Sequence, residues 1–345
     1  MAKKKKKNSR SKSGPDIAKK ESSWPWLLIL SVLMVLMAVM VLIPFLKGPS
    51  DSDTNETTVP GVTTPTVDDS NSTTMRIVQA GTAYVEKKTS AGTVFSFRRG
   101  DKVEVVEMDH EWVTIAVDGH AYYLPRNMVR GMDEYVIVLD AGHQLREDIG
   151  KEAIGPGGAE TEQKMDVGNT GVYSGQQEYD VTLNIVLVLQ AELESRGYTV
   201  YLTRNNNAVN ISYKERTDVA SNLHADAFIS IHNGWSDDPE VRGLGAVCQT
   251  SANSYVAELY TESQALCKQL LISATHATGS KKLDIREDDK VAAINWSKVP
   301  MALLELGYLS NENDDRLLTS VQYLTTLIDG LADGLDIYFT GSPKE

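Results

Sequence analysis

The chain has 345 residues, too many for one small domain, and a formal net charge of −13. Nine lysines and arginines but one acid lie within residues 1–20, whereas 24 basic and 45 acidic residues follow Lys47. This acidic main part argues against nucleic acid as a principal ligand. The basic tail, residues 1–23, is most simply a topology signal that also contacts anionic lipid.

An uncharged apolar segment, Trp24–Leu46, follows the basic tail. Its 23 residues are long enough to cross about 30 Å of hydrocarbon as a helix. A cleaved signal peptide is the alternative, but its apolar core is usually shorter, roughly 7–15 residues. The positive-inside rule then predicts a single-pass anchor with a cytoplasmic N-terminus and an extracytoplasmic remainder.

Residues 47–74 are rich in Ser, Thr, Asp and Pro and are expected to form a flexible linker. Short alternating runs begin at Met75, and the turn Asp118-Gly119 separates two of them, which predicts a hairpin. Four or five short strands in this stretch predict a small all-β barrel over residues 75–131.

This stretch resembles the bacterial Src-homology-3-like domains attached to cell-wall enzymes. The resemblance is carried by the turn Gly100-Asp101, by Trp112 with the alternating residues after it, by Gly119 and by Tyr122–Pro125. It implies that the segment binds wall peptides. A role as a spacer is an equally good interpretation.

From Asp133 onward, strand patterns alternate with helix patterns. The predicted strands are Tyr135–Leu139, Tyr198–Thr203, Ala227–Ile231, Ala246–Thr250 and Met301–Leu306. The predicted helices are Tyr179–Arg196, a helix from the capping box at Ser212 to about His224, Ser254–Ala277 and Glu312–Leu335. This alternation predicts an α/β domain over residues 133–340, with a largely parallel sheet flanked by helices.

One long stretch, residues 144–177, carries no clear pattern and is rich in Gly, Glu and Gln. A loop of this length in a compact domain is usually functional or disordered. Because it begins directly after His143, we expect it to flank a cleft, either as a lid or as a grip on substrate.

Candidate metal-binding side chains stand at the ends of the buried strand patterns. His143 follows the first strand, His232 ends the central one, and Glu178 opens the helix between them. Strands of an open α/β sheet present their carboxyl ends at one edge, so the three can share an ion. His and carboxylate ligands with one open position are typical of catalytic zinc, which lowers the pKa of bound water to about 7.

Glu305 follows the apolar run Met301–Leu304 and is the candidate catalytic residue. Hydrolysis of an amide needs a group that takes a proton from water and delivers it to the leaving nitrogen. Arg286 and Asn295 are candidates for contacting substrate or the developing oxyanion. Arg204 and Arg216 are expected to brace the fold through ion pairs.

At these residues the chain resembles the zinc-dependent N-acetylmuramoyl-L-alanine amidases of bacterial cell-wall turnover. The matching motifs recur in order: Leu139–His143, Glu178 before a long helix, Tyr201–Arg204, Glu215-Arg216, Phe228–Asn233 and Pro300–Asn311. The resemblance implies a phosphorylase/hydrolase-like fold, one Zn²⁺ held by His143, Glu178 and His232, and Glu305 as general base and acid. It also implies cleavage of the amide between N-acetylmuramic acid and L-alanine of the stem peptide.

Two departures from the family pattern lie near the expected cleft. Gln144 stands where the family commonly has a second glycine, and Ala293–Lys298 replaces the usual residues before Pro300. They put fine substrate preference in question. The implied partners are peptidoglycan and the cytoplasmic membrane, and the oligomeric state is left open. The alternatives are a zinc peptidase that cuts another stem-peptide bond and a non-catalytic protein that binds the cell wall.

Overall fold

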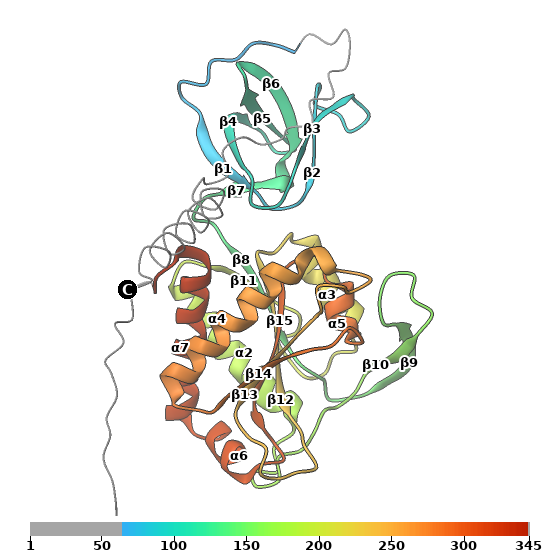
Figure 1. Ribbon diagram of the computed structural model, residues 1–345, viewed down its shortest axis with the longest axis vertical. Helices are drawn as coiled ribbons and strands as arrows, with labels where there is room; N and C mark the ends of the chain where they lie inside the picture. Colours follow the sequence, from blue (N-terminus) through green and yellow to red (C-terminus); the bar gives the residue numbers. More distant parts are fainter. Residues whose placement is uncertain (1–63, 344–345) are drawn as a thin grey trace, which may run out of the picture. The chain divides into compact units, whose positions relative to one another are not determined.

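A computed structural model describes residues 64–343 of the chain (Figure 1). The predicted basic tail, the apolar segment at 24–46 and most of the linker lie outside these residues. Across 64–343, no helix combines the length and apolar character needed to cross a membrane.

The first described part is all-β and has its own core. Seven strands form one antiparallel sheet in the order β3-β2-β6-β5-β4-β1-β7. Their bounds are Thr73–Ile77 (β1), Gly81–Tyr84 (β2), Thr93–Phe97 (β3), Lys102–Met108 (β4), Trp112–Val117 (β5), His120–Pro125 (β6) and Val129–Gly131 (β7), with a 3-10 turn, η1, at Arg126–Met128. The hairpin expected at Asp118-Gly119 joins β5 to β6, and both turn residues have positive φ, at 52° and 75°.

A six-stranded sheet forms the centre of the second part, in the order β11-β8-β12-β15-β13-β14. The strands are Val136–Ala141 (β8), Thr199–Leu202 (β11), Ala227–Gly234 (β12), Leu244–Cys248 (β13), Lys282–Glu287 (β14) and Met301–Tyr308 (β15). The sheet is mixed, because β13 runs antiparallel to β15. The expectation of a largely parallel sheet was therefore wrong.

The connection between β12 and β13 explains this reversal. Only residues 235–243 join the two strands, and they contain no helix. A parallel return needs a crossover of a dozen or more residues, whereas a short loop turns the chain back on itself. The helix α4 (Tyr260–Thr278) then provides such a crossover from β13 to β14, and that pair is parallel.

Helices cover both faces of this sheet, as Figure 1 shows. One face packs on α2 (Glu178–Ser195), α4 and α7 (Val321–Thr340), and the other on α3 (Tyr213–Asn222) and α5 (Ala292–Trp296). Neighbouring strand residues alternate between the two cores: Ile137 and Ile229 face one, and Val138 and Phe228 face the other. The result is a three-layer α/β/α arrangement.

The C-terminal segment differs from the single helix expected at Glu312–Leu335. It forms two helices, α6 (Glu312–Leu318) and α7, separated at Thr319 and Ser320. The Ser320 hydroxyl accepts a hydrogen bond from the Tyr323 backbone N–H and so caps the second helix. A short 3-10 turn, η2 (Ala257–Leu259), likewise precedes α4, which begins six residues later than expected.

The stretch 144–177, expected to be a loop, contains an antiparallel hairpin of β9 (Asp148–Ala153) and β10 (Thr161–Met165). A hydrogen bond connects this hairpin to the rest of the domain, because the Trp296 indole N–H donates to the Ala153 carbonyl at 2.7 Å.

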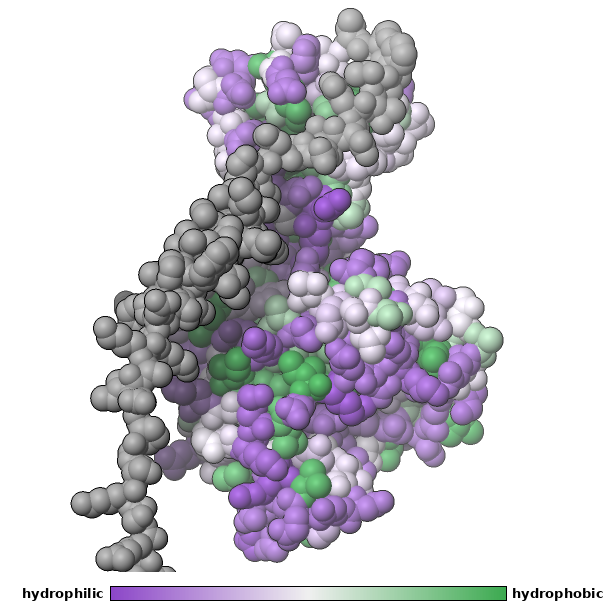
Figure 2. All heavy atoms as spheres, in the orientation of Figure 1, coloured by the Kyte–Doolittle hydropathy of each residue, from purple (hydrophilic) through white to green (hydrophobic). Residues whose placement is uncertain are grey.

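Figure 2 shows that the face turned to the viewer is mainly hydrophilic, with apolar side chains in separate small patches.

Candidate active site

His143 stands just beyond β8, on a tight turn. Its backbone has φ 62°, in the left-handed region that a histidine rarely occupies and that costs of order 1 kcal/mol. Gly142 precedes it, and a Cβ there would lie 2.4 Å from Cε1 of His232. Glycine is therefore required at 142, because the backbone packs directly against the second imidazole.

A buried carboxylate, Asp140, anchors this turn from inside β8. It pairs with Arg216 at 2.8 Å and accepts hydrogen bonds from the hydroxyls of Thr203 and Ser230. Burial alone would raise the pKa of Asp140, but the Arg216 guanidinium and the two hydroxyls lower it to about 2. Asp140 therefore stays ionised inside the fold.

Two buried arginines hold the backbone that carries His143. Arg216 donates to the carbonyls of Ala141 and His143, at 2.6 and 2.9 Å, and Arg204 donates to those of Ala141 and Gly142, at 2.8 and 2.9 Å. Both side chains thus brace the fold, as expected, although Arg204 does so through carbonyl oxygens. These bonds offset the strain of the left-handed turn.

Glu178 is the first residue of α2, and it is almost completely buried. Its Oε1 accepts the Asn233 backbone N–H at 2.9 Å, and its Oε2 accepts the Asn169 backbone N–H at 3.0 Å. A carboxylate at a helix N-terminus is also favoured by the helix dipole. Glu178 lies at the helix N-terminus because α2 begins directly after the 144–177 stretch.

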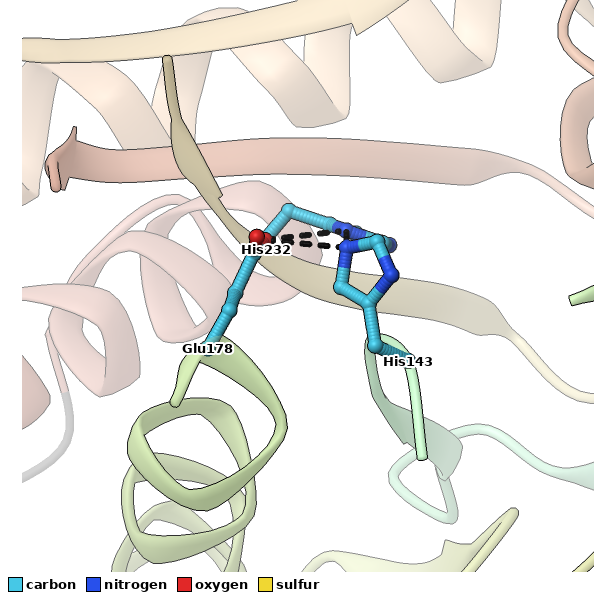
Figure 3. A group of neighbouring side chains, drawn as sticks. All are labelled: His143, Glu178 and His232. Atoms are coloured by element: carbon cyan, nitrogen blue, oxygen red, sulfur yellow. Dashed lines mark hydrogen bonds and ion pairs between the residues drawn. The ribbon is translucent and has the colours of Figure 1, made fainter. Parts of the chain in front are cut away.

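The three side chains converge from a strand-end turn, a helix N-terminus and a strand, as Figure 3 shows. Nε2 of His143 lies 3.1 Å from Oε1 of Glu178 and 3.1 Å from Nδ1 of His232, and the last two atoms are 3.5 Å apart. Ligands at roughly 2.0–2.1 Å around a tetrahedral zinc are separated by about 3.4 Å. The triangle therefore fits three corners of a zinc site.

Charge at this group also favours a cation. Burial lowers the pKa of His143, but the carboxylates of Asp166 and Glu178 outweigh it and raise that pKa to about 9. Burial raises the pKa of Glu178, but the imidazoles of His143 and His232 hold it well below its usual range. Carboxylates thus dominate the site and stabilise positive charge.

Glu305 lies in β15, in register with His232 of β12. Its side chain is 21% exposed, its Oε1 is 3.5 Å from Nη2 of Arg286, and its Oε2 accepts the Tyr308 hydroxyl at 3.3 Å. Arg286 itself lies on β14, two strands away, and is 55% exposed. The structure thus brings Arg286 to Glu305, a placement that sequence alone left open.

A cavity of about 360 Å³ connects these groups, lined by His143, Glu178, His232, Glu305 and Arg286. A larger cavity of about 530 Å³ lies between residues 145–149 and 208–210 and contains none of them. The smaller cavity is the candidate active site, because the convergent polar groups lie there.

Asn295 does not line this cavity. It is fully buried in α5, where its amide donates to the Asp289 carbonyl at 2.8 Å and its oxygen accepts from Asn253 at 2.9 Å. Both the amide nitrogen and the amide oxygen of Asn295 are hydrogen-bonded, so Asn295 holds the loop around α5 in place and is not positioned to contact substrate.

Three residues that contact the candidate site were not predicted from the sequence: Asp166, Asn169 and Tyr308. Asn169 lies in the glycine-rich run at 168–171 and Tyr308 lies in the motif Pro300–Asn311, whereas Asp166 lies in no motif of the sequence.

Comparison with known proteins agrees with this geometry. The sequence model of the N-acetylmuramoyl-L-alanine amidase family matches residues 137–336, more than half of the chain. The chain belongs to this family. The match covers the six-stranded sheet except for Val136, the first residue of β8, and it contains His143, Glu178, His232 and Glu305.

One curated relative is the "Probable cell wall amidase LytH" of Staphylococcus aureus, 29% identical over 163 residues, which are 47% of this chain. The chain spans about half the length of the curated relatives it matches. Two solved structures share the fold: the amidases Ami1 of Mycobacterium smegmatis and of Mycobacterium abscessus. Both have a TM-score of 0.54 and cover 60% of this chain, at 21% and 22% identity, over 98% and 99% of their own lengths.

Proposed function

We propose that this protein is a zinc-dependent N-acetylmuramoyl-L-alanine amidase that hydrolyses peptidoglycan. The bond cut is the amide between the lactyl group of N-acetylmuramic acid and L-alanine of the stem peptide. One observation carries the proposal: three ligand atoms 3.1–3.5 Å apart share a cavity with a carboxylate that is not among them, Glu305. Membership of the amidase family supports the choice of substrate.

His143, Glu178 and His232 would hold the metal through Nε2, Oε1 and Nδ1. A zinc ion bound there would act as a Lewis acid and lower the pKa of a water molecule to about 7. The hydrogen bonds that Glu178 accepts at both oxygens keep its carboxylate in one orientation. The three ligands thus need little rearrangement to bind the ion.

Glu305 would accept the proton of the attacking water and pass it to the leaving amide nitrogen. Arg286 and the Tyr308 hydroxyl contact its two oxygens, so the carboxylate has a fixed direction. Because Arg286 is half exposed at the cavity, its remaining N–H groups can donate to the substrate carbonyl oxygen as negative charge develops.

We also propose an extracytoplasmic location for this site, with residues 24–46 as a single-pass anchor and the residues from 47 up to the seven-stranded sheet as a tether. The support is the sequence alone: an uncharged segment of 23 residues that follows a basic tail. Contact of the seven-stranded sheet with wall peptides remains a prediction from resemblance. Protease protection of the N-terminal tail in sealed vesicles would test the orientation.

The decisive experiment is mass spectrometry of purified peptidoglycan after digestion by the full-length protein. An amidase releases peptides that begin at L-alanine and leaves glycan that bears free lactyl groups. Cleavage inside the stem peptide would instead identify a zinc peptidase. Binding to peptidoglycan without any cleavage, at saturating zinc, would favour a non-catalytic protein that binds the cell wall.

A further inference from the structure

The stretch 144–177 reaches the proposed metal site through the turn that follows β10. The Asp166 carboxylate lies against Nδ1 of His143 as an ion-pair partner. That nitrogen is buried and makes no regular hydrogen bond within residues 64–343, so Asp166 is the acceptor available to it. Nε2 of the same ring faces Glu178 and His232. Asp166 therefore contacts the side of the imidazole that points away from the other two proposed ligands.

The same turn also contacts the second ligand. Asn169 donates to Oε2 of Glu178 twice, from its backbone N–H at 3.0 Å and from its side-chain amide at 3.3 Å. These bonds occupy Oε2 and leave Oε1 directed at the two imidazoles. Four consecutive residues, 166–169, thus set the direction of two of the three proposed ligands.

The turn is packed tightly enough to act in this way. Gly168 has φ 71°, and a Cβ there would lie 2.8 Å from both the His143 ring and Oε2 of Glu178. Met165, directly before the turn, is fully buried, and Asp166 accepts the Gly168 backbone N–H at 2.8 Å. The other strand of the hairpin, β9, is also attached to the domain, because the Lys214 backbone N–H of α3 donates to the Glu152 carboxylate at 3.2 Å.

We propose that Asp166 is a positioning residue of the metal site and that the 166–169 turn is a built-in part of it. Asp166 accepts the proton on Nδ1 of His143, and this fixes the ring in the tautomer whose Nε2 lone pair binds metal. The stretch 144–177 accordingly supports the ligands, a role separate from the lid or substrate grip considered from sequence. The inference rests on the metal site of the proposed function.

The expected effect is on metal affinity. Outer partners of metal-binding histidines typically change affinity by about 10–100-fold when they are removed. The Asp166 side chain is 53% exposed, so its ion pair contributes little to folding and its replacement should leave the fold intact.

The test compares zinc affinity of the full-length protein with that of Asp166→Ala and Asp166→Asn, by competition with a chelating dye. We expect about 10–100-fold weaker binding in Asp166→Ala, with partial recovery in Asp166→Asn, which keeps an acceptor oxygen. Glu160→Gln is the matched control, because Glu160 is an exposed acid of the same hairpin that meets Lys290 at 3.5 Å. It should bind zinc like the unaltered protein.

A second readout separates positioning from a general loss of structure. In the zinc-free protein at about pH 10, where the imidazole is neutral, nitrogen chemical shifts of the His143 ring should show a proton on Nδ1 in the unaltered protein and a tautomer mixture in Asp166→Ala. Unchanged affinity and an unchanged tautomer in Asp166→Ala would overturn the inference. His143→Ala tests whether the proposed metal site itself is correct. If that variant also binds zinc with unchanged affinity, the metal site, and with it the proposed function, is wrong.

Discussion

Glu305 and His232 are register partners on the neighbouring parallel strands β15 and β12. Adjacent strands are about 4.8 Å apart, so the carboxylate stands beside a proposed ligand without belonging to the ligand triangle. This relationship separates proton transfer from metal binding.

Glu305→Gln should therefore abolish catalysis and spare the metal. We expect peptidoglycan hydrolysis to fall by about 10²–10⁴-fold, the usual contribution of a general acid–base group. Zinc content, measured by elemental analysis, should stay at one ion per chain. Glu312→Gln, at an exposed acid of α6 that pairs with Arg316, is the control and should retain activity. A fully active Glu305→Gln would show that another group moves the proton.

Removal of the metal should reduce both activity and stability. A chelator should stop hydrolysis, and added zinc should restore it. At a zinc concentration about 100 times its Kd, binding stabilises the native state by about 2.7 kcal/mol, so the Tm should rise by several degrees. Glu178→Ala should lose this zinc-dependent rise. If the variant keeps the full rise, the ion binds somewhere other than at the proposed triangle.

Asp140 should make the stability of the fold depend on pH. Its folded pKa of about 2 lies below the ordinary 3.8, so the stabilisation is fully present above pH 4 and is lost as pH falls towards 2. The shift corresponds to about 2 kcal/mol. Asp140→Asn also leaves Arg216 buried without its carboxylate, so we expect a loss of about 3 kcal/mol at pH 7.

Denaturant unfolding at pH 7 and at pH 3 checks this prediction. The difference in unfolding free energy between the two pH values should be smaller in Asp140→Asn than in the unaltered protein. Asp237→Asn, in the exposed loop after β12, should preserve that difference. An equal pH dependence in all three proteins would contradict the role given to Asp140.

Gln144 should hold the 205–211 loop in place. Its side chain is fully buried, donates to the Arg146 carbonyl and to Asn210, and accepts from the Ile211 backbone N–H at 3.1 Å. Gln144→Gly removes this side chain and leaves its partners unsatisfied. We expect a loss of about 1–3 kcal/mol and faster hydrogen exchange at the Ile211 amide. Unchanged exchange would mean that other contacts fix the loop.

Replacement of Arg286 should lower kcat and leave the free energy of unfolding nearly unchanged, because its exposed ion pairs contribute little to folding. We expect Arg286→Ala to lower kcat by about tenfold or more, with partial recovery in Arg286→Lys, which keeps the charge. Lys298→Ala, at a cation outside the cavity, is the comparison. A change in KM alone would assign Arg286 to substrate binding.

The proposed ligands could be predicted because strand patterns are local and the carboxyl ends of parallel strands meet at one edge. Val136–Ala141 and Ala227–Gly234 both form strands, and His143 and His232 lie together where the patterns end. The capping box at Ser212 also forms, since it depends on residues three apart.

Other features depend on packing between distant segments and leave little trace in the sequence. Asp166 reaches His143 across 22 intervening residues, and no periodicity marks it. The strand Lys282–Glu287 alternates weakly among charged residues, as an edge strand does, and was missed. The antiparallel direction of β13 follows from the short 235–243 loop before it, and the pattern of residues within a strand does not show its direction.

That reversed strand has a practical consequence. Because β13 returns at once beside β15, the 235–243 loop begins and ends at the edge of the sheet that carries the proposed ligands. The three proposed ligands, Glu305 and Arg286 all lie outside this loop, and its Trp235 is 46% exposed. It is thus a segment near the proposed ligands but outside the lining of the cavity, whose exposed side chains can be exchanged without replacing any proposed ligand.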